Sequence, residues 1–284
     1  MASRSGSPWR RHALAIRLAT AVAGLGCGPS EPDPEITFAK DGTDVASAEG
    51  DVELLAASLV GGGAGTLTLS AEGLGGRLGG VQPADIGDGA RAVFLPAGCL
   101  TVTHSLPERS VAYRFDGCLG PFGLRRVSGT VSVVYTKSTE GLALDVKASG
   151  LTIGRATGVA FTARAEISAG AQPGERRTAW RAELEGVSAR DRSMKRSITR
   201  TLQFSTGGTC VDTSGKSTGT VAGATLDVVV EGVRRCRGAC PEAGGKIQVS
   251  GEGRGPLTLT FDGTTEAKVD VGGKTQTVAL ACAK

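Results

Sequence analysis

The chain has no asparagine, few histidines and few aromatic residues. Asparagine is absent, so there is no N-x-[ST] glycosylation acceptor, and turns must rely on Gly, Asp, Ser and Pro. Of two histidines, only His104 lies beyond the first 26 residues, which excludes metal sites built from two or three histidine ligands. Aromatic residues make up 4% of the chain, too few for the girdles of a transmembrane barrel. These absences narrow the chemistry that the chain can perform.

The positive charge of the chain comes from its first 26 residues. The formal net charge is +4, and the arginines at positions 4, 10, 11 and 17 are accompanied there by no acidic residue. From Cys27 onward the formal charge is therefore zero. A neutral chain has no basic excess with which to neutralise phosphates, so we expect no nucleic-acid partner.

The same 26 residues are typical of an export signal. A positively charged start precedes the apolar stretch 13–25, which only Arg17 and Thr20 interrupt, and small residues follow. The stretch is shorter than the ~20 residues that a membrane-spanning helix needs, and no later stretch approaches that length. We expect export and no transmembrane helix.

The segment Gly24-Leu25-Gly26-Cys27 resembles the cleavage box of bacterial lipoproteins, in which a small residue precedes a lipidated cysteine. Gly26 matches, whereas Gly24 stands where that family prefers leucine. The resemblance implies cleavage before Cys27, palmitate-type acyl chains on it, and anchoring to the bacterial envelope, most simply the outer membrane. At ~0.8 kcal/mol per buried methylene, several chains anchor a protein permanently. The alternatives are an ordinary secretory signal, giving a secreted or periplasmic protein, and a twin-arginine signal at Arg10-Arg11.

Composition divides the chain into four segments. Residues 1–26 are the export signal. Residues 27–40 are acidic and proline-rich, which resists helix formation and predicts a flexible, lipid-anchored tether. Residues 41–90 comprise a predicted helix and a glycine-rich connection, and residues 91–284 form the predicted β domain.

One helix is predicted, over residues 43–60. Val45, Ala48, Val52, Leu55 and Leu59 recur on one face of it, which indicates packing on a sheet. Thr43 or Asp44 is the predicted N-cap and Gly61 follows the end. Gly50 in the interior costs ~1 kcal/mol of helix stability.

Beyond residue 91, short segments alternate apolar and polar residues almost to the end of the chain. Gly-Gly, Asp-Gly and Pro-Gly connections separate them, as in β-hairpins. Spacing typical of βαβ units is missing. The prediction is an all-β fold, an antiparallel meander that curls into a barrel or a sandwich, with the N-terminal helix packed on it.

The cysteine count predicts disulfides. Setting Cys27 aside leaves an even set, and an even number in an exported chain indicates three disulfides; the six are Cys99, Cys118, Cys210, Cys236, Cys240 and Cys282. The alternative is a zinc site formed by the last four. Its Cys-x3-Cys spacing is not the usual one, and thiolates seldom stay reduced outside the cytosol.

A hairpin register supports the first pair. Two alternating segments flank a Leu-Pro-Glu-Arg-Ser connection. One register places Val102 opposite Phe115, with His104 on the same apolar face. The same register places Cys99 opposite Cys118. Such a cross-link stabilises by roughly 3 kcal/mol.

Symmetry about a turn supports the second pair. Cys210 and Cys236 are equidistant from Gly223, between two β-rich segments. This pairing leaves Cys240 for Cys282.

Two segments carry opposite charge. Residues 171–200 hold eight basic residues against four acidic ones, whereas residues 31–53 are acidic. A solvated face, contact with an anionic envelope polysaccharide or lipid headgroup, and neutralisation of one segment by the other are the three interpretations.

No motif of known mechanism is found. His104 has no partner for a Ser-His-Asp set, and Gly215-Lys216-Ser217 lacks the earlier glycine of a phosphate-binding loop, so we interpret it as a turn. We expect no catalytic residue, no cofactor and no metal. A hydrolase that uses paired carboxylates is the third-ranked function.

The chain resembles uncharacterised lipoproteins of the myxobacterial type, on the leader with Cys27 and on short segments such as Phe115-Asp-Gly-Cys-Leu and Cys236-Arg-Gly-Ala-Cys-Pro. The resemblance implies a location and no activity. The leading hypothesis is a non-catalytic structural, adhesive or binding module of the envelope. The alternative is a carrier of an apolar ligand, in which the helix forms a lid over an incompletely closed sheet.

Overall fold

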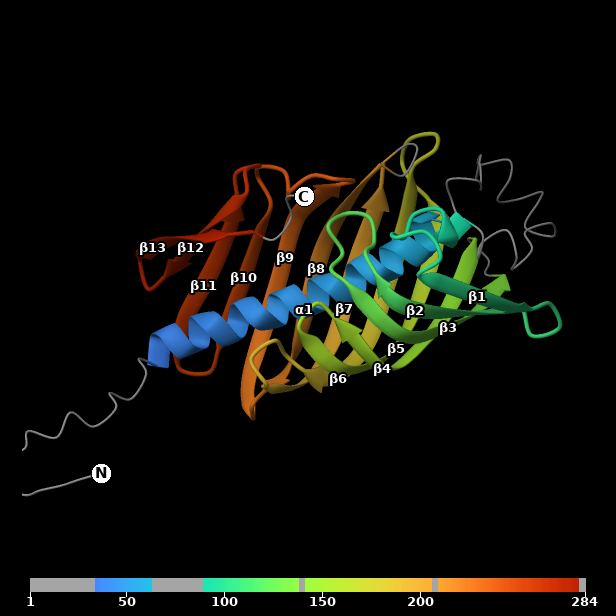
Figure 1. The fold of residues 1–284 in the computed structure, drawn as a ribbon. Coiled ribbons are helices and arrows are strands. Elements are labelled where there is room, and N and C mark those ends of the chain that lie inside the picture. The colour runs from blue at the N-terminus through green and yellow to red at the C-terminus, as the bar shows by residue number, and fades with distance from the viewer. Residues whose placement is uncertain (1–33, 63–88, 138–140, 206–208, 281–284) are drawn as a thin grey trace, which may run out of the picture. The chain divides into compact units, whose positions relative to one another are not determined.

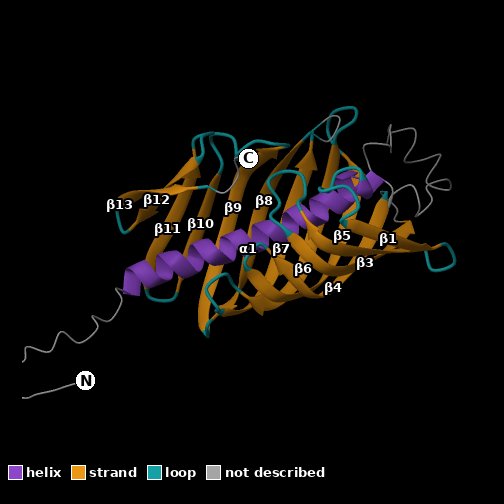
Figure 2. Cartoon of the chain, in the orientation of Figure 1, coloured by secondary structure: helices purple, strands orange, loops and turns teal. Residues whose placement is uncertain are grey.

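The fold consists of one long helix and one antiparallel sheet (Figures 1 and 2). The computed structural model describes residues 34–62, 89–137, 141–205 and 209–280. Helix α1 spans Pro34–Gly62. The sheet has 13 strands, and each strand pairs with its neighbours in chain order. The predicted antiparallel meander is confirmed.

The strands are β1 (Leu100–Ser105), β2 (Ser110–Cys118), β3 (Val127–Lys137), β4 (Leu142–Ile153), β5 (Ala156–Ala169), β6 (Arg176–Val187), β7 (Ser193–Phe204), β8 (Cys210–Val221), β9 (Ala224–Cys236), β10 (Lys246–Gly251), β11 (Arg254–Phe261), β12 (Glu266–Val271) and β13 (Lys274–Ala279). The sheet does not close on itself, so β1 and β13 are its two edges. It curls around α1, which lies in its concave face. The helix begins beside β10 to β13 and ends towards β1 to β3 (Figure 1).

Alternation along the strands builds the core. On β6, buried and exposed residues alternate from Arg176 to Glu185, and Trp180 is fully buried on the inner face. The inner faces of the other strands supply apolar side chains that contact the helix, while the outer faces are polar. This is the arrangement expected of a sheet with one buried face.

The helix begins nine residues earlier than predicted, so residues 34–40 of the predicted tether are helical. Pro34 is the first helical residue, the position where the missing N–H of proline costs nothing. Thr43 is therefore not a cap: its hydroxyl donates a 2.8 Å hydrogen bond to the carbonyl of Ala39, one turn earlier. The end of the helix, at Gly62, agrees with the glycine stop.

The helix is enclosed rather than packed on one face. All five predicted contact residues are buried, and so is every residue from 51 to 59. Three of the buried helix residues are acidic: Glu49, Asp51 and Glu53. A single apolar stripe was too narrow an interpretation, because the curled sheet reaches around the helix.

Two glycines of α1 offer a matched test of this packing. A methyl group at Gly50 would lie 3.5 Å from Nη2 of Arg235, an ordinary contact, whereas one at Gly42 would lie 2.9 Å from Cγ1 of the buried Val249. We expect Gly50→Ala to raise the free energy of unfolding by about 0.5–1 kcal/mol through helix propensity. Gly42→Ala is expected to lower it by about 1–2 kcal/mol through overpacking. Urea unfolding measures both, and changes of the same sign would contradict this packing.

The predicted register of the first hairpin is wrong by two residues. Tyr113, rather than Phe115, lies opposite Val102, and the ladder continues to the pair Ser105 and Ser110, which a four-residue turn joins. An even shift keeps each side chain on its predicted face. His104 nevertheless is exposed, opposite Val111 near the end of the hairpin.

The interpretation of Gly215-Lys216-Ser217 as a turn is also wrong, because these residues lie within β8. Gly215 pairs with Arg200 and Gly219 pairs with Arg196 on β7. Their φ angles are 140° and 149°, and a Cβ would lie 2.3 Å and 2.0 Å from backbone oxygens of β7. Only glycine permits this close approach of the two strands.

Candidate functional site

The acidic residues of α1 meet arginines of the sheet. Ion pairs join Asp41, Asp44, Asp51, Glu49 and Glu53 of the helix to arginines from three parts of the sheet domain: Arg125, which precedes β3; Arg190 and Arg192, which precede β7; and Arg196 and Arg200 on β7. Of the three interpretations of these charged segments, mutual neutralisation therefore holds for part of the basic segment. Four of the eight basic residues between 171 and 200 take part.

Glu49 is the centre of this network. Arg196 donates from Nε to Oε1 at 2.6 Å, and Arg200 donates from Nη2 to Oε2 at 3.1 Å. The hydroxyl of Ser217 donates to Oε2 at 2.6 Å and accepts from Arg196 at 3.2 Å. Arg196 also donates to the carbonyl of Leu226 at 2.6 Å. The charged side chains of Glu49, Arg196 and Arg200 are at most 1% exposed.

The sequence folds this way because of the period of β7. Arg196 and Arg200 lie in phase with Met194, Ile198 and Leu202, so alternation directs all five inward. Long arginine side chains need space, and the glycines of β8 opposite them provide it. Ser217 lies between those glycines and points inward as well.

The carboxylate of Glu53 has fewer hydrogen-bond partners than that of Glu49. Its Oε1 lies 2.9 Å from Nε of Arg200, yet neither atom has a hydrogen-bond partner of acceptable geometry. A cavity of about 20 Å³ adjoins Glu53, Arg200 and Arg235, which is enough for one water molecule. Burial raises the pKa of Glu53 from 4.5 to about 7, against the opposing effect of the Arg200 charge, and the nearby Glu49 adds to the rise.

Further ion pairs lie along the helix. Nε and Nη2 of Arg125 both donate to Oδ2 of Asp51, the first at 2.7 Å. Burial is the main cause that raises the pKa of Asp51. Towards the start of the helix, Arg190 donates to Asp44 at 2.7 Å. These carboxylates hold the helix against the sheet. Paired carboxylates of the kind that a hydrolase needs are thus present at Glu49 and Glu53, but they are buried and bound to arginines.

Two predicted disulfides are confirmed. Cys99–Cys118 joins the ends of the first hairpin with a Cα–Cα distance of 5.4 Å, and Cys210–Cys236 joins β8 to β9 across paired positions. Cys240 is also disulfide-bonded, and its predicted partner Cys282 lies outside the described residues, as does Cys27. The disulfides indicate an oxidising, extracytoplasmic compartment.

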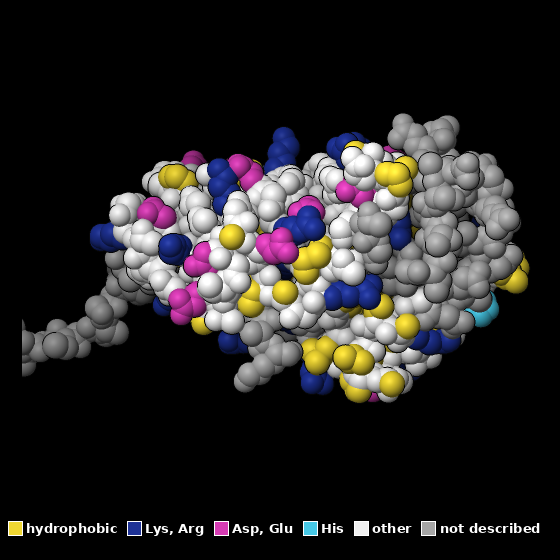
Figure 3. Space-filling model, turned by 90° about the horizontal axis from the view of Figure 1, so that it is seen from above, with side chains coloured by type: hydrophobic (Ala, Val, Ile, Leu, Met, Phe, Trp, Pro, Cys, Tyr) yellow, Lys and Arg dark blue, Asp and Glu magenta, His cyan; other side chains and the backbone are white. Residues whose placement is uncertain are grey.

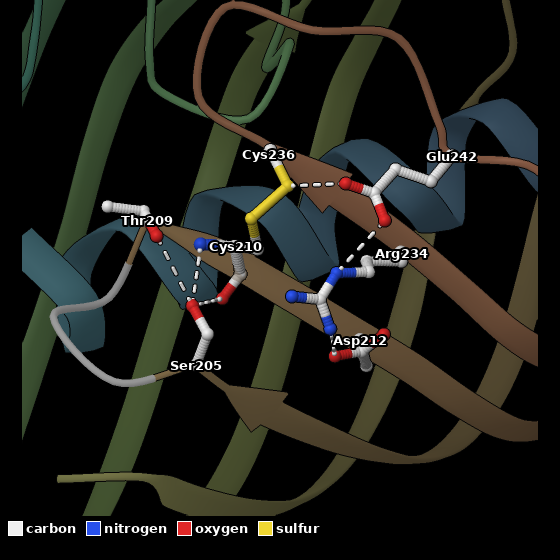
Figure 4. Close-up of a disulfide and its surroundings, with 7 residues drawn as sticks. All are labelled: Ser205, Thr209, Cys210, Asp212, Arg234, Cys236 and Glu242. Atoms are coloured by element: carbon white, nitrogen blue, oxygen red, sulfur yellow. Dashed lines mark hydrogen bonds and ion pairs between the residues drawn. A yellow bond between two sulfur atoms is a disulfide. The ribbon is translucent and has the colours of Figure 1, made fainter. Parts of the chain in front are cut away.

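The surroundings of Cys210–Cys236 bear on the zinc alternative (Figure 4). Glu242 lies 3.2 Å from Sγ of Cys236 and forms an ion pair with Arg234, which also binds Asp212. Sulfur in a disulfide carries no proton and is no thiolate, so this short distance is a contact rather than a hydrogen bond or a ligand set. The zinc interpretation is wrong for Cys210 and Cys236.

A groove opens where α1 begins. It has a volume of about 540 Å³ between the helix and the β12–β13 hairpin, and its apolar wall consists of Ala39, Val269, Val271 and Val278. A second hollow of about 270 Å³ shares Thr43 and Val278 with this groove. Its lining includes the apolar Leu259, Phe261 and Leu280 and the charged Asp51, Arg125 and Arg235.

Elsewhere, the described surface is mainly polar, with a few exposed apolar side chains such as Leu95, Leu106 and Leu119. Figure 3 shows basic and acidic side chains interspersed on one face, with small hydrophobic groups between them. Arg177, Arg181 and Lys195 of the basic segment are exposed on the outer face of the sheet. A shallow hollow of about 470 Å³ there is lined by side chains such as Glu183, Glu185 and Lys195.

Sequence reasoning missed the residues that form the buried network. The alternation of β7 could have indicated Arg196 and Arg200, because both occupy positions on the same face as the buried apolar residues. No such signal was available for Ser217, because the glycines and polar residues of β8 indicate a turn when taken alone. The groove was not predictable either, since it depends on where the start of the helix lies relative to the last hairpin.

Comparison with known proteins identifies no relative: no protein-family model, curated protein or solved structure matches the chain. Within the described residues, no helix combines the length and the apolar character needed to cross a bilayer.

Proposed function

We propose that this chain is a lipid-anchored protein of the bacterial envelope, attached through Cys27 to the outer membrane, and that its β domain is a non-catalytic binding module. The observation that carries the binding role is the apolar groove beside the start of α1. Well-formed, mainly apolar concavities of about 300–1,000 Å³ are where proteins bind small ligands.

Three features support the anchored module. The disulfides suit a location outside the cytoplasm. The lipobox-like segment ends at Cys27, and residues 28–33 allow that cysteine to lie at most roughly 25 Å from Pro34. A lipid on Cys27 would therefore keep the helix start, and the groove beside it, within reach of the membrane surface.

A carrier of an apolar ligand is the second candidate, and the same groove favours it. The carrier hypothesis drawn from the sequence treats the helix as a lid that opens. Opening would expose to water the apolar side chains by which the helix packs on the sheet, such as Val45, Val52 and Leu55, and that cost opposes it. Binding at the groove without displacement of the helix is the form that the geometry favours.

Fractionation tests the anchor. The wild-type chain is expected to partition into the membrane fraction and Cys27→Ala into the soluble fraction, because removing the lipidated sulfur removes the acyl chains. Cys118→Ala is the matched control, since it removes a cysteine without touching the anchor. Unchanged partition of Cys27→Ala would refute the anchor and leave the groove unaffected.

A further inference from the structure

We infer that the groove between the start of α1 and the β12–β13 hairpin binds a fatty acid, an unbranched acyl chain that ends in a carboxylate. The inference rests on the proposed binding function and names the ligand of that site. It follows from the shape of the groove, from the chemistry of its walls and from the charges at its mouth.

The walls select an apolar chain. Val269 and Val271 on β12, with Val278 on β13, form the sheet side, and Ala39 and Thr43 form the helix side. These side chains are small or branched and leave space between helix and hairpin. At its inner end the groove shares Val278 and Thr43 with a second hollow, which Phe261 and Leu280 also line. The apolar wall beside Val271 suits the acyl chain.

The mouth selects the head group. Lys40 and Lys274 line the groove, both are exposed, and neither forms an ion pair with the described residues. Arg190 also lines the groove, but Asp44 and Asp41 already neutralise it. The two free lysines therefore leave an excess of positive charge at the opening, which complements a carboxylate and repels a cation.

The edge position of β13 explains why the groove is open. β13 pairs on one side only, with β12, and most of its residues are exposed. The inner face of this hairpin carries Lys274, Gln276 and Val278, and α1 has its first turns here. The helix thus covers the inner faces of the middle strands fully and leaves this end of the sheet accessible.

Calorimetric titration of dodecanoate tests the inference. The full chain with Cys27→Ala, purified without detergent, is expected to bind dodecanoate with one site per chain. Dodecyltrimethylammonium has the same alkyl chain and the opposite charge, and it is expected to bind with an affinity at least about tenfold lower. Because Cys27 is replaced, the result does not depend on whether the anchor exists.

Variants assign the site. Lys40→Glu with Lys274→Glu is expected to weaken dodecanoate binding about tenfold or more, while the charge-matched control Lys147→Glu with Lys216→Glu on the outer face leaves it unchanged. Val278→Trp is expected to abolish binding by filling the groove, and its partly exposed position keeps the core intact. Equal affinity for the two head groups, or binding that survives both the lysine double variant and Val278→Trp, would overturn the inference. No binding of dodecanoate at all would overturn it as well, and membrane fractionation would still decide the anchor.

Discussion

Glu49→Ala is expected to lower the free energy of unfolding by about 3–5 kcal/mol. The substitution leaves Arg196 and Arg200 buried without the carboxylate that both of them bind. It also leaves the hydroxyl of Ser217 without its acceptor. An uncompensated buried charge costs far more than a lost contact at the surface, because the interior cannot solvate it. Urea unfolding followed by far-ultraviolet circular dichroism measures the change.

An exposed ion pair supplies the control for this prediction. Asp145 binds Arg164 at 3.1 Å on the outer face, where both side chains are about half exposed. Asp145→Ala is expected to cost less than about 1 kcal/mol, since water screens and replaces the pair. If Glu49→Ala costs no more than Asp145→Ala, the buried network does not hold the helix as the geometry indicates.

Stability is expected to fall as the pH rises from about 5 to about 8, by about 2–3 kcal/mol on account of Glu53. The pKa of Glu53 is about 7 in the folded protein and 4.5 as the ordinary value, so the folded state binds the proton more tightly. The stabilisation is fully present below 4.5 and is lost as the pH rises through 7. Above that pH the buried carboxylate is charged. The positive charges of Arg200 and Arg235 stabilise the charged form, whereas burial and the negative charge of Glu49 destabilise it.

Glu53→Gln isolates this contribution. An amide resembles the protonated acid in shape and carries no charge, so the variant is expected to lose the part of the pH dependence that Glu53 causes. Burial also raises the pKa of Asp51, but Asp51 is present in both proteins, so the difference between wild type and variant reports on Glu53 alone. Unfolding at about pH 5 and about pH 8 gives that difference. A wild-type protein with the same pH dependence as Glu53→Gln would show that the buried carboxyl keeps its ordinary pKa.

The two predictions concern the same structural question, which is what keeps a helix with three buried acids inside a sheet. Apolar side chains such as Val45, Val52 and Leu55 are buried, and apolar contact is non-directional, so it does not by itself set a register. The ion pairs of Glu49 have strict geometry. We therefore interpret the network as the element that sets the position of α1 along the concave face, and with it the width of the groove at the helix start.

The class of the fold and much of its covalent framework follow from the amino-acid sequence alone. Alternation with glycine-containing turns was enough for an antiparallel meander, because the period of a strand is visible in any segment that buries one face. The count of cysteines and their symmetry about Gly223 were enough for Cys210–Cys236. The opposite charges of residues 31–53 and 171–200 were enough to suggest that they meet.

The register of the first hairpin and the start of the helix were harder to predict from the sequence. The first hairpin lay two residues from its predicted pairing, because its turn is shorter than the connection inferred from polarity. The helix began at Pro34, although proline-rich segments ordinarily exclude helix, because the first helical position tolerates proline.

The members of the buried network and the position of the groove depend on tertiary packing. β8 has little intrinsic preference for a strand, and it becomes one because its glycines fit beside Arg196 and Arg200 of β7. Ser217 acquires its role from that pairing alone. The groove forms where the first turns of α1 meet the β12–β13 hairpin, and no local pattern in the sequence encodes the meeting of two segments so far apart in the chain.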